Sequence, residues 1–489
     1  MLEPNATNLV PTTVNSTSHT DDHPADSCAT TGLLQDPKVL IEVVPISRLT
    51  ANKGNARTHT RKQTRQIADS IKRFGFNNPI LVDDHGEIIA GHGRVAAAKL
   101  LGLDEVPALQ LSHLSAEEKR AYVLADNRLA ELAGWDPQIL AIELQALIDV
   151  DFDVELTGFD MGEIDILLED GDEARREGAG REDDIPDPVP DPAVSRAGDL
   201  WILGNHRLLC GDARYSEAYA TVLGGEKAQL VFTDLQHSLR RDGEVCGFGA
   251  IQHSESAMAS GEMSSDEFTG FLKTVFRQLV AHTIDGSIHY LCADWRHVLE
   301  MMLAGNEAYS ELKNVCARAK TNAGTGSIYR CQHELIFVWK SGDGPPINNA
   351  ELGQHRRNRS NLWTYAGVNT MRPRRLEELA MHPTVKPVDL VADAIRDTSR
   401  RNAIILDPFM GSGTTMIAAE RTGRRARGLE IDPVYLDVAI RRWQSHSGKS
   451  ATLAATDQTF EQVAEERHPA NPVDRANDET SAPPVREVA

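Results

Sequence analysis

The sequence has little cysteine, few aromatic residues and no long apolar run. Only 6 of its 489 residues are cysteines, and they form no Cys-x-x-Cys pair, so we predict no zinc or other metal site. Scattered cysteines of this kind are typical of free thiols in a reducing compartment. No apolar segment approaches the roughly 18 residues of a membrane-spanning helix, and the N-terminus lacks the basic and then apolar pattern of a secretory signal. We therefore expect a cytoplasmic protein that does not cross a membrane.

Basic charge is also scarce, because 51 lysines and arginines stand against 72 acids and the formal net charge is −21. The charge is unevenly distributed. Residues 151–192 contain sixteen acids and three arginines, whereas residues 353–444 contain fifteen arginines and one lysine against ten acids. Nucleic-acid binding needs local positive charge rather than a basic chain as a whole. We therefore expect a DNA-facing surface in the C-terminal region.

Composition and hydrophobic periodicity divide the chain into five segments. Residues 1–37 and 446–489 are polar and predicted to be disordered. Residues 38–130 have the short strand-like and helical runs of a small α/β domain. Residues 131–192 begin with amphipathic helical sequence and end as an acidic, proline-rich linker. Residues 193–445 alternate strand-like and helical runs, which predicts a doubly wound, Rossmann-like sheet that binds ligands at its strand ends.

A glycine-containing loop at residues 407–415 is the strongest chemical signal. Its sequence Asp-Pro-Phe-Met-Gly-Ser-Gly-Thr-Thr lies between a buried-strand pattern and a helical run, where glycine permits a tight turn close to a ligand. Glu430 ends the next strand-like run, where a carboxylate can accept both hydroxyls of a ribose. A nicotinamide-binding loop would need a third glycine at Met416. The loop therefore predicts binding of a different nucleoside cofactor, with a purely structural turn as the alternative.

Five strings in this order give residues 198–444 a family resemblance. They are Leu-Leu-Cys-Gly-Asp-Ala at 208–213, Val-Phe-Thr-Asp at 231–234, Met-His-Pro-Thr-Val-Lys-Pro at 381–387, the loop at 407–415, and Glu430. Together they resemble the N6-adenine/N4-cytosine DNA methyltransferases in which the catalytic motif precedes the cofactor motif. This resemblance implies S-adenosylmethionine as cofactor and a methyltransferase-type α/β fold.

The same resemblance implies which residues bind the cofactor. Asp212 would lie near the adenine, Phe409 would flank it, and Lys386 would lie near the methionine carboxylate, because an ammonium suits an anionic group. Two alternatives stay open, since Lys386 could be a solvated surface lysine and Asp212 could cap a helix. The full implied set is Asp212, Lys386, Asp407, Phe409, Gly411, Gly413, Thr414 and Glu430.

The catalytic motif departs from the family pattern. The family has Asp-Pro-Pro-Tyr, whereas this chain reads Asp234-Leu235-Gln236-His237. In the family the aspartate and the next carbonyl accept hydrogen bonds from the target amine, and the aromatic ring stacks on the flipped base. Asp234 keeps the acceptor and His237 could stack, so these two residues are the catalytic candidates. Loss of both prolines loosens the carbonyl, which puts activity in doubt, and Asp234 could also be a strand-end cap.

Clustered arginines are candidates for contacts with double-stranded DNA. The guanidinium group presents a fork of donors to phosphate oxygens, so arginines in basic runs suit the DNA backbone. A solubilising surface is the alternative for each of them. The candidates are Arg356, Arg357, Arg359, Arg374 and Arg375.

The N-terminal domain resembles the ParB/sulfiredoxin-like domains. The resemblance rests on Ile-Ile-Ala-Gly-His-Gly-Arg at 88–94 and Ala-Asp-Asn-Arg at 125–128. In partition proteins the matching Gly-Glu-Arg-Arg site binds nucleotide phosphates at a helix N-terminus. Here His92 and Gly93 replace the middle residues and only Gly91 and Arg94 remain. Three interpretations stay open: binding of DNA or a nucleotide, nucleotide hydrolysis or nuclease activity, and a structural turn in which Arg94 caps carbonyls.

These observations predict a DNA methyltransferase that modifies an exocyclic base amine, with adenine N6 as the expected target. One alternative is a catalytically impaired relative that binds DNA as a regulator or partition-type protein. Another is an N-methyltransferase that acts on a small molecule or a protein, against which the arginine-rich region and the ParB-like domain argue.

Overall fold

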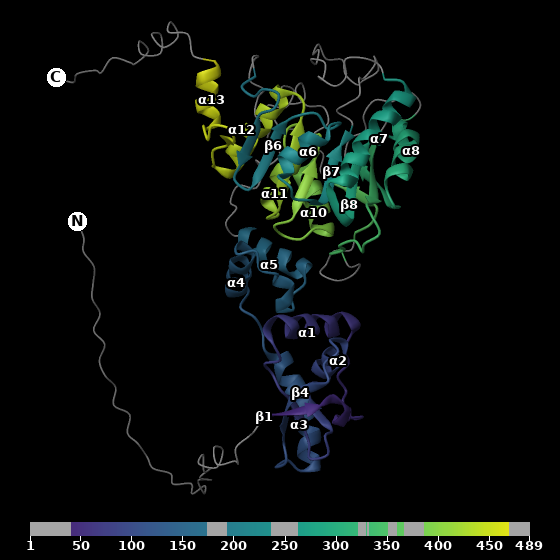
Figure 1. The fold of residues 1–489 in the computed structure, drawn as a ribbon, viewed down its shortest axis with the longest axis vertical. Helices are drawn as coiled ribbons and strands as arrows, with labels where there is room; N and C mark the ends of the chain where they lie inside the picture. Colours follow the sequence, from purple (N-terminus) through teal and green to yellow (C-terminus); the bar gives the residue numbers. More distant parts are fainter. Residues whose placement is uncertain are drawn as a thin grey trace, which may run out of the picture. The chain divides into compact units, whose positions relative to one another are not determined.

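A computed structural model describes residues 41–173, 193–235, 263–320, 329, 332–350, 359–365 and 386–468. The chain divides into two compact units, one ending at Ala133 and one beginning at Gly134 (Figure 1). In the described part of the chain, no helix has the length and apolar character needed to cross a bilayer.

The first unit is a small α/β domain built on a four-stranded sheet. Its strand order is β1-β4-β2-β3, in which β4 pairs antiparallel with β1 and parallel with β2. The buried side chains of Ile80, Ile88, Val95 and Val106 form part of the core between the sheet and the helices. Its elements are β1 (Ile41–Pro45), η1 (Ile46–Arg48), α1 (Arg61–Phe74), β2 (Ile80–Val82), β3 (Ile88–Ala90), α2 (His92–Leu100), β4 (Glu105–Gln110) and α3 (Ala116–Leu132).

The second unit is built on a ten-stranded mixed sheet with the order β11-β9-β10-β8-β7-β12-β13-β6-β5-β14. Its five neighbouring strands β8, β7, β12, β13 and β6 run parallel, which confirms the predicted doubly wound, Rossmann-like class. The strands are β5 (Leu200–Leu203), β6 (His206–Cys210), β7 (Ala228–Asp234), β8 (Thr283–Ala293), β9 (Glu311–Ala319), β10 (His333–Lys340), β11 (Leu362–Thr364), β12 (Ile404–Asp407), β13 (Arg425–Glu430) and β14 (Thr452–Leu453).

Helices cover both faces of this sheet. Successive side chains of a strand point to opposite faces, and along β7 Leu230 and Phe232 enter one core while Val231 enters the other. One face carries α6 (Ser216–Leu223), α7 (Ser265–Ala281) and α8 (Val298–Ala308); the other carries α10 (Val388–Thr398), α11 (Thr414–Arg421) and α12 (Pro433–Ser447). Figure 1 shows α7 beside α8 next to β8. Because α7 follows β7 and α11 follows β12, the direction of winding reverses between these two neighbouring strands.

A short helical module precedes the sheet, in a region interpreted from sequence as helical and then linker. It contains α4 (Pro137–Asp149), η2 (Val154–Thr157) and α5 (Met161–Glu173). Leu144, Ile148, Met161 and Ile164 are buried together and form its own small core. The acidic composition of this region obscured the apolar residues that fold it.

Asp165 of α5 joins the module to the sheet domain. Its carboxylate is fully buried and accepts hydrogen bonds from Arg424 at 2.8 and 2.9 Å and from Arg401 at 3.1 Å. Burial alone would raise the pKa of Asp165, but the two guanidinium groups lower it below its usual value. Arg424 directly precedes β13, so the module attaches at the amino ends of the parallel strands.

The tail also differs from the sequence expectation of disorder after residue 446. Residues 451–468 add strand β14 and helix α13 (Phe460–Arg467) to the domain. Phe460 is 2% exposed and its ring centroid lies 5.3 Å from that of Trp201 on β5. A few apolar side chains in a polar stretch therefore suffice to order it, because an existing core accepts them.

We predict that Asp165→Asn destabilises the second unit by about 3–5 kcal/mol, because it leaves two buried guanidinium groups without their carboxylate. Differential scanning calorimetry should show a lower melting temperature. Asp149→Asn removes the same charge from an exposed position of the same module and should leave the transition nearly unchanged. Equal effects of the two substitutions would contradict this assignment.

Candidate active site

The candidate site lies where the winding of the sheet reverses. Asp234 ends β7 and Asp407 ends β12, and these strands are parallel neighbours. The hydroxyl of Thr233 donates a hydrogen bond to Asp407 at 2.7 Å and ties the two strand ends together. Doubly wound sheets bind their ligands in the crevice at this position. The structure thus brings the predicted catalytic residue beside the predicted cofactor loop.

The glycine loop is held by the carboxylate of Asp407. It accepts hydrogen bonds from the hydroxyl of Thr415 at 2.6 Å and from the amide of Phe409 at 3.0 Å. Gly411 and Gly413 have φ angles of 53° and 84°, and a Cβ on Gly413 would lie 3.1 Å from the Cβ of Ala439. Glycine is required there for backbone conformation and for space. Burial raises the pKa of Asp407 to about 6, although its hydroxyl and amide donors oppose that effect.

Glu430 ends β13, the next parallel strand. Its two carboxylate oxygens accept hydrogen bonds from the amides of Gly411 at 2.8 Å and of Asp432 at 3.0 Å. Burial raises the pKa of Glu430 to about 7, against the lowering effect of these two donors. The acid predicted for ribose hydroxyls therefore touches the glycine loop directly.

Asp212 follows β6, the strand beside β13. The amide of Gly211 donates to the carbonyl of Glu430 at 2.9 Å, which brings the loop of Asp212 next to that acid. The carboxylate of Asp212 is engaged by Arg214 through Nε at 2.9 and 3.0 Å and through Nη2 at 2.5 Å. The carboxyl ends of β7, β12, β13 and β6 thus hold Asp234, the loop, Glu430 and Asp212 along one edge.

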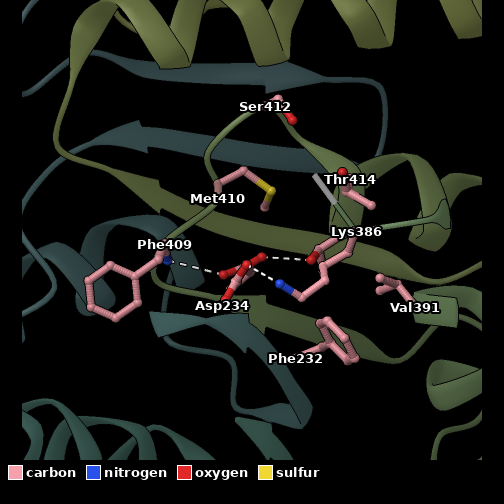
Figure 2. Close-up of a pocket in the computed structure, with 10 residues that line it drawn as sticks. Phe232, Asp234, Lys386, Val391, Phe409, Met410, Ser412 and Thr414 are labelled. Carbon is pink, nitrogen blue, oxygen red and sulfur yellow. Dashed lines mark hydrogen bonds and ion pairs between the residues drawn. The ribbon is translucent and has the colours of Figure 1, made fainter. Parts of the chain in front are cut away.

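Lys386 lies inside the site and not on the surface. Its side chain is 4% exposed, and its ammonium contacts the carboxylate of Asp234 (Figure 2). The ammonium also lies 3.4 Å from the carboxylate of Glu334. Burial alone would lower the pKa of Lys386, but the two carboxylates raise it above its usual value. The alternative of a solvated surface lysine does not describe this residue.

Glu334, at the start of β10, extends the charged cluster. It accepts from Arg318 Nη1 at 2.9 Å and pairs with Lys320 Nζ at 2.7 Å. Burial would raise the pKa of Glu334, but Lys386, Arg318 and Lys320 lower it well below its usual range. The sequence analysis assigned no role to Glu334. A glutamate directly before an apolar strand-like run nevertheless indicates a buried acid that needs a charged partner.

A cavity of about 30 Å³ lies at the centre of the site. Figure 2 shows Lys386 reaching across it towards Asp234, with Met410 on the loop above. The side chains of the site suit the expected cofactor by their chemistry, because the site combines an ammonium with carboxylates and apolar side chains. The residues that line the cavity are Phe232, Asp234, Lys386, Val391, Asp407, Phe409, Met410, Ser412, Thr414 and Thr415.

Several predicted residues lie elsewhere or outside the described part of the chain. His237 and four of the predicted DNA-contacting arginines fall outside it: Arg356, Arg357, Arg374 and Arg375. Arg359 is described, and its guanidinium pairs with Asp393 at 2.6 Å and Asp397 at 3.1 Å over the ring of Trp363. A DNA contact by Arg359 stays a prediction, and the structure adds these internal partners.

The N-terminal unit has a separate pocket of about 380 Å³, lined by residues that include Arg57, Asn127 and Arg128. In the Gly-His-Gly-Arg turn, His92 accepts a hydrogen bond from the amide of Asn52 at 3.3 Å, and Arg94 donates to the carbonyl of Pro79 at 3.3 Å. Burial lowers the pKa of His92. These contacts fit the structural interpretation of the turn. Among the described residues no cluster of three or more His, Cys, Asp or Glu side chains could hold a metal ion.

Comparison with known families assigns the parts of the chain. Residues 229–441 match the DNA methylase family, residues 138–197 match the ParB-methyltransferase HTH domain, and residues 33–128 match the ParB N-terminal domain. The chain therefore contains a domain similar to the DNA methylases and a ParB-type N-terminal domain. The helical module described above falls largely within the HTH match.

Individual relatives match single parts of this chain. The ParB-like nuclease domain-containing protein YnaK of Escherichia coli K12 is 49% identical over 83 residues, which are 17% of this chain and 95% of that protein. The type II methyltransferase M.ScaI of Streptomyces caespitosus is 34% identical over 91 residues, 19% of this chain and 30% of M.ScaI. The match thus spans less than a third of that methyltransferase.

Among solved structures, the putative DNA modification methylase TTHA0409 of Thermus thermophilus, complexed with S-adenosyl-L-methionine, is 21% identical. The match covers 49% of this chain and 94% of that one, with a TM-score of 0.34.

We predict that the second unit loses stability relative to its Glu430→Gln variant as the pH rises from 5 to 8. Glu430 has a folded pKa of about 7 and an ordinary value of 4.5, so the folded state binds a proton that the unfolded chain has released. The stabilisation is present in full below pH 4.5 and disappears as the pH rises through 7, at most about 3 kcal/mol. Melting temperatures across this range give the difference in slope. Glu217→Gln, on the surface of α6, should run parallel to the wild type.

Proposed function

We propose that this chain is an S-adenosylmethionine-dependent DNA methyltransferase that modifies an exocyclic base amine, with adenine N6 as the target. The observation that supports it most is the position of Asp234 at the end of β7, beside the glycine loop at the end of β12. An acceptor for an amine and a site for a nucleoside cofactor are then adjacent. The family match of residues 229–441 supports the same reaction class.

Residues from several strand ends would hold the cofactor. Glu430 would accept its ribose hydroxyls, Lys386 would pair with its carboxylate, and Asp212 and Phe409 would lie beside its adenine. Asp407, Gly411, Gly413 and Thr414 form the turn that would hold it. When bound, the cofactor would supply an electrophilic methyl group on a sulfonium; its direct transfer to the amine nitrogen would leave a thioether, and the amine would release one proton.

Asp234 has the role of orienting the amine. A base amine is a weak nucleophile because its lone pair is delocalised into the ring, and a hydrogen bond to a carboxylate favours the more tetrahedral, nucleophilic nitrogen. Asp234 is 8% exposed and lies at the edge of the small cavity, so it can accept this bond with little competition from water. His237 would stack on the base in place of the family's tyrosine.

The DNA would contact the basic C-terminal region and not the helical module. Residues 134–173 contain thirteen acids and no lysine or arginine, so this module cannot neutralise phosphates. Arg356, Arg357, Arg374 and Arg375 are the proposed phosphate contacts. We propose DNA or a nucleotide as the ligand of the N-terminal unit, which keeps Gly91 and Arg94 and has the pocket beside Arg57.

The alternative, an impaired methyltransferase that acts as a DNA-binding regulator, is favoured by one observation. Leu235 and Gln236 replace two prolines directly after Asp234, and Leu235 is buried at 1% exposure. The chain has therefore used the first of these positions for packing and has lost the stiffness that proline would supply.

We predict that labelled methyl groups pass from the cofactor to mixed-sequence double-stranded DNA, and that Asp234→Ala abolishes transfer while cofactor binding persists.

Replacing Leu235, Gln236 and His237 with Pro, Pro and Tyr should raise the rate, by up to about a hundredfold, because it stiffens the accepting carbonyl. Melting curves check that this variant folds. Binding of cofactor and DNA without transferred label would support the regulator, and label transferred only to proteins or small amines would support another N-methyltransferase.

A further inference from the structure

Lys386 lies between two carboxylates that the sheet holds at fixed positions. Asp234 pairs with Cys292 on β8, and Cys292 pairs with Ile336 on β10, two residues after Glu334. Both acids therefore lie at the same edge of the sheet, on either side of β8. The ammonium of Lys386 contacts both of them, so small side-chain movements can change how it is shared.

The two carboxylates differ in how many cations surround them. Glu334 also binds Arg318 and Lys320, so it keeps two cationic partners if Lys386 moves away. The five side chains together carry two negative and three positive charges. Glu334 is therefore still compensated when Lys386 moves towards another anion.

The space next to Lys386 is the space beside the glycine loop. Lys386 lines the same small cavity as Met410, Ser412 and Thr414. An anionic group that enters beside the loop therefore meets an ammonium that already contacts Asp234. One lysine ammonium cannot pair optimally with both the carboxylate of Asp234 and an incoming anionic group. The incoming group therefore competes with Asp234 for Lys386.

We propose that the ammonium of Lys386 is handed over from Asp234 to the carboxylate of the incoming cofactor. This inference rests on the proposed function and deepens it. The exchange frees an oxygen of Asp234 for the target amine only after the cofactor has bound. Cofactor binding thereby prepares the acceptor, and Lys386 acts as a positioning residue as well as a cofactor ligand.

Isothermal titration calorimetry with two probes tests the exchange in the full-length protein. S-adenosylhomocysteine carries the amino-acid carboxylate, whereas 5′-methylthioadenosine has the same nucleoside and a thioether without it. We expect Asp234→Asn to tighten S-adenosylhomocysteine binding by about tenfold and to leave 5′-methylthioadenosine within about twofold of the wild type. The amide has no charge with which to compete for the ammonium.

A double-mutant cycle separates competition at Lys386 from a general change in charge. In a Lys386→Gln background, Asp234→Asn should no longer tighten S-adenosylhomocysteine binding. Glu226→Gln is the matched control, because it removes one acid just before β7, at the opposite edge of the sheet, where Glu226 pairs with Arg425. It should leave the affinity for both probes unchanged.

The outcomes are distinct. Equal effects of Asp234→Asn on both probes, or no effect on either, would overturn the hand-over while leaving cofactor binding intact. A tightening that persists in the Lys386→Gln background would overturn it too. If Lys386→Gln melts early, the comparison of the two probes on Asp234→Asn still decides. If the wild type bound neither probe, this result would contradict the proposed function and, with it, the proposed exchange at Lys386.

Discussion

The parallel pairing of β7 with β12 is the constraint on which the rest of this site depends. Since α7 follows β7 on one face and α11 follows β12 on the other, the crossover connections separate at this point and leave the two strand ends open. Asp234 and Asp407 are brought together by that pairing although 173 positions separate them in the chain. The hydrogen bond from Thr233 to Asp407 then links the end of β7 to the glycine loop.

Buried charges are compensated in the same way at two distant places in the second unit. At the carboxyl ends of the strands, Lys386 is surrounded by Asp234 and Glu334; at the amino ends, Asp165 is surrounded by Arg424 and Arg401. In each case a charge removed from water has more than one partner of opposite sign, which offsets the cost of desolvation. The two clusters differ in what they adjoin: the Asp165 cluster joins a module to the sheet, whereas the Lys386 cluster borders the cavity.

Local sequence patterns predicted the glycine loop and the acid at Glu430, but not the charged residues around them. The loop at 407–415 and Glu430 could be predicted because glycine positions and strand-end acids follow from backbone geometry within one strand–loop–helix–strand unit. Glu334 was not assigned a role, since its partners Arg318, Lys320 and Lys386 come from three separate segments. The module at 137–173 and the ordered residues 451–468 were obscured by their composition, because a few residues such as Ile164 and Phe460 bury themselves against neighbours that no local window contains.

The sequence by itself determined the class of the sheet, the turn at Gly411 and Gly413, the acid at Glu430 and the string Leu235-Gln236-His237 after Asp234. These features depend on residue type and short-range spacing, which the chain carries in any conformation. Only the tertiary structure decided that Lys386 is buried between Asp234 and Glu334, and that Arg359 is engaged by Asp393 and Asp397. Ion pairs between distant segments arise from packing, and a side chain's burial and charge partners exist only once those segments have met.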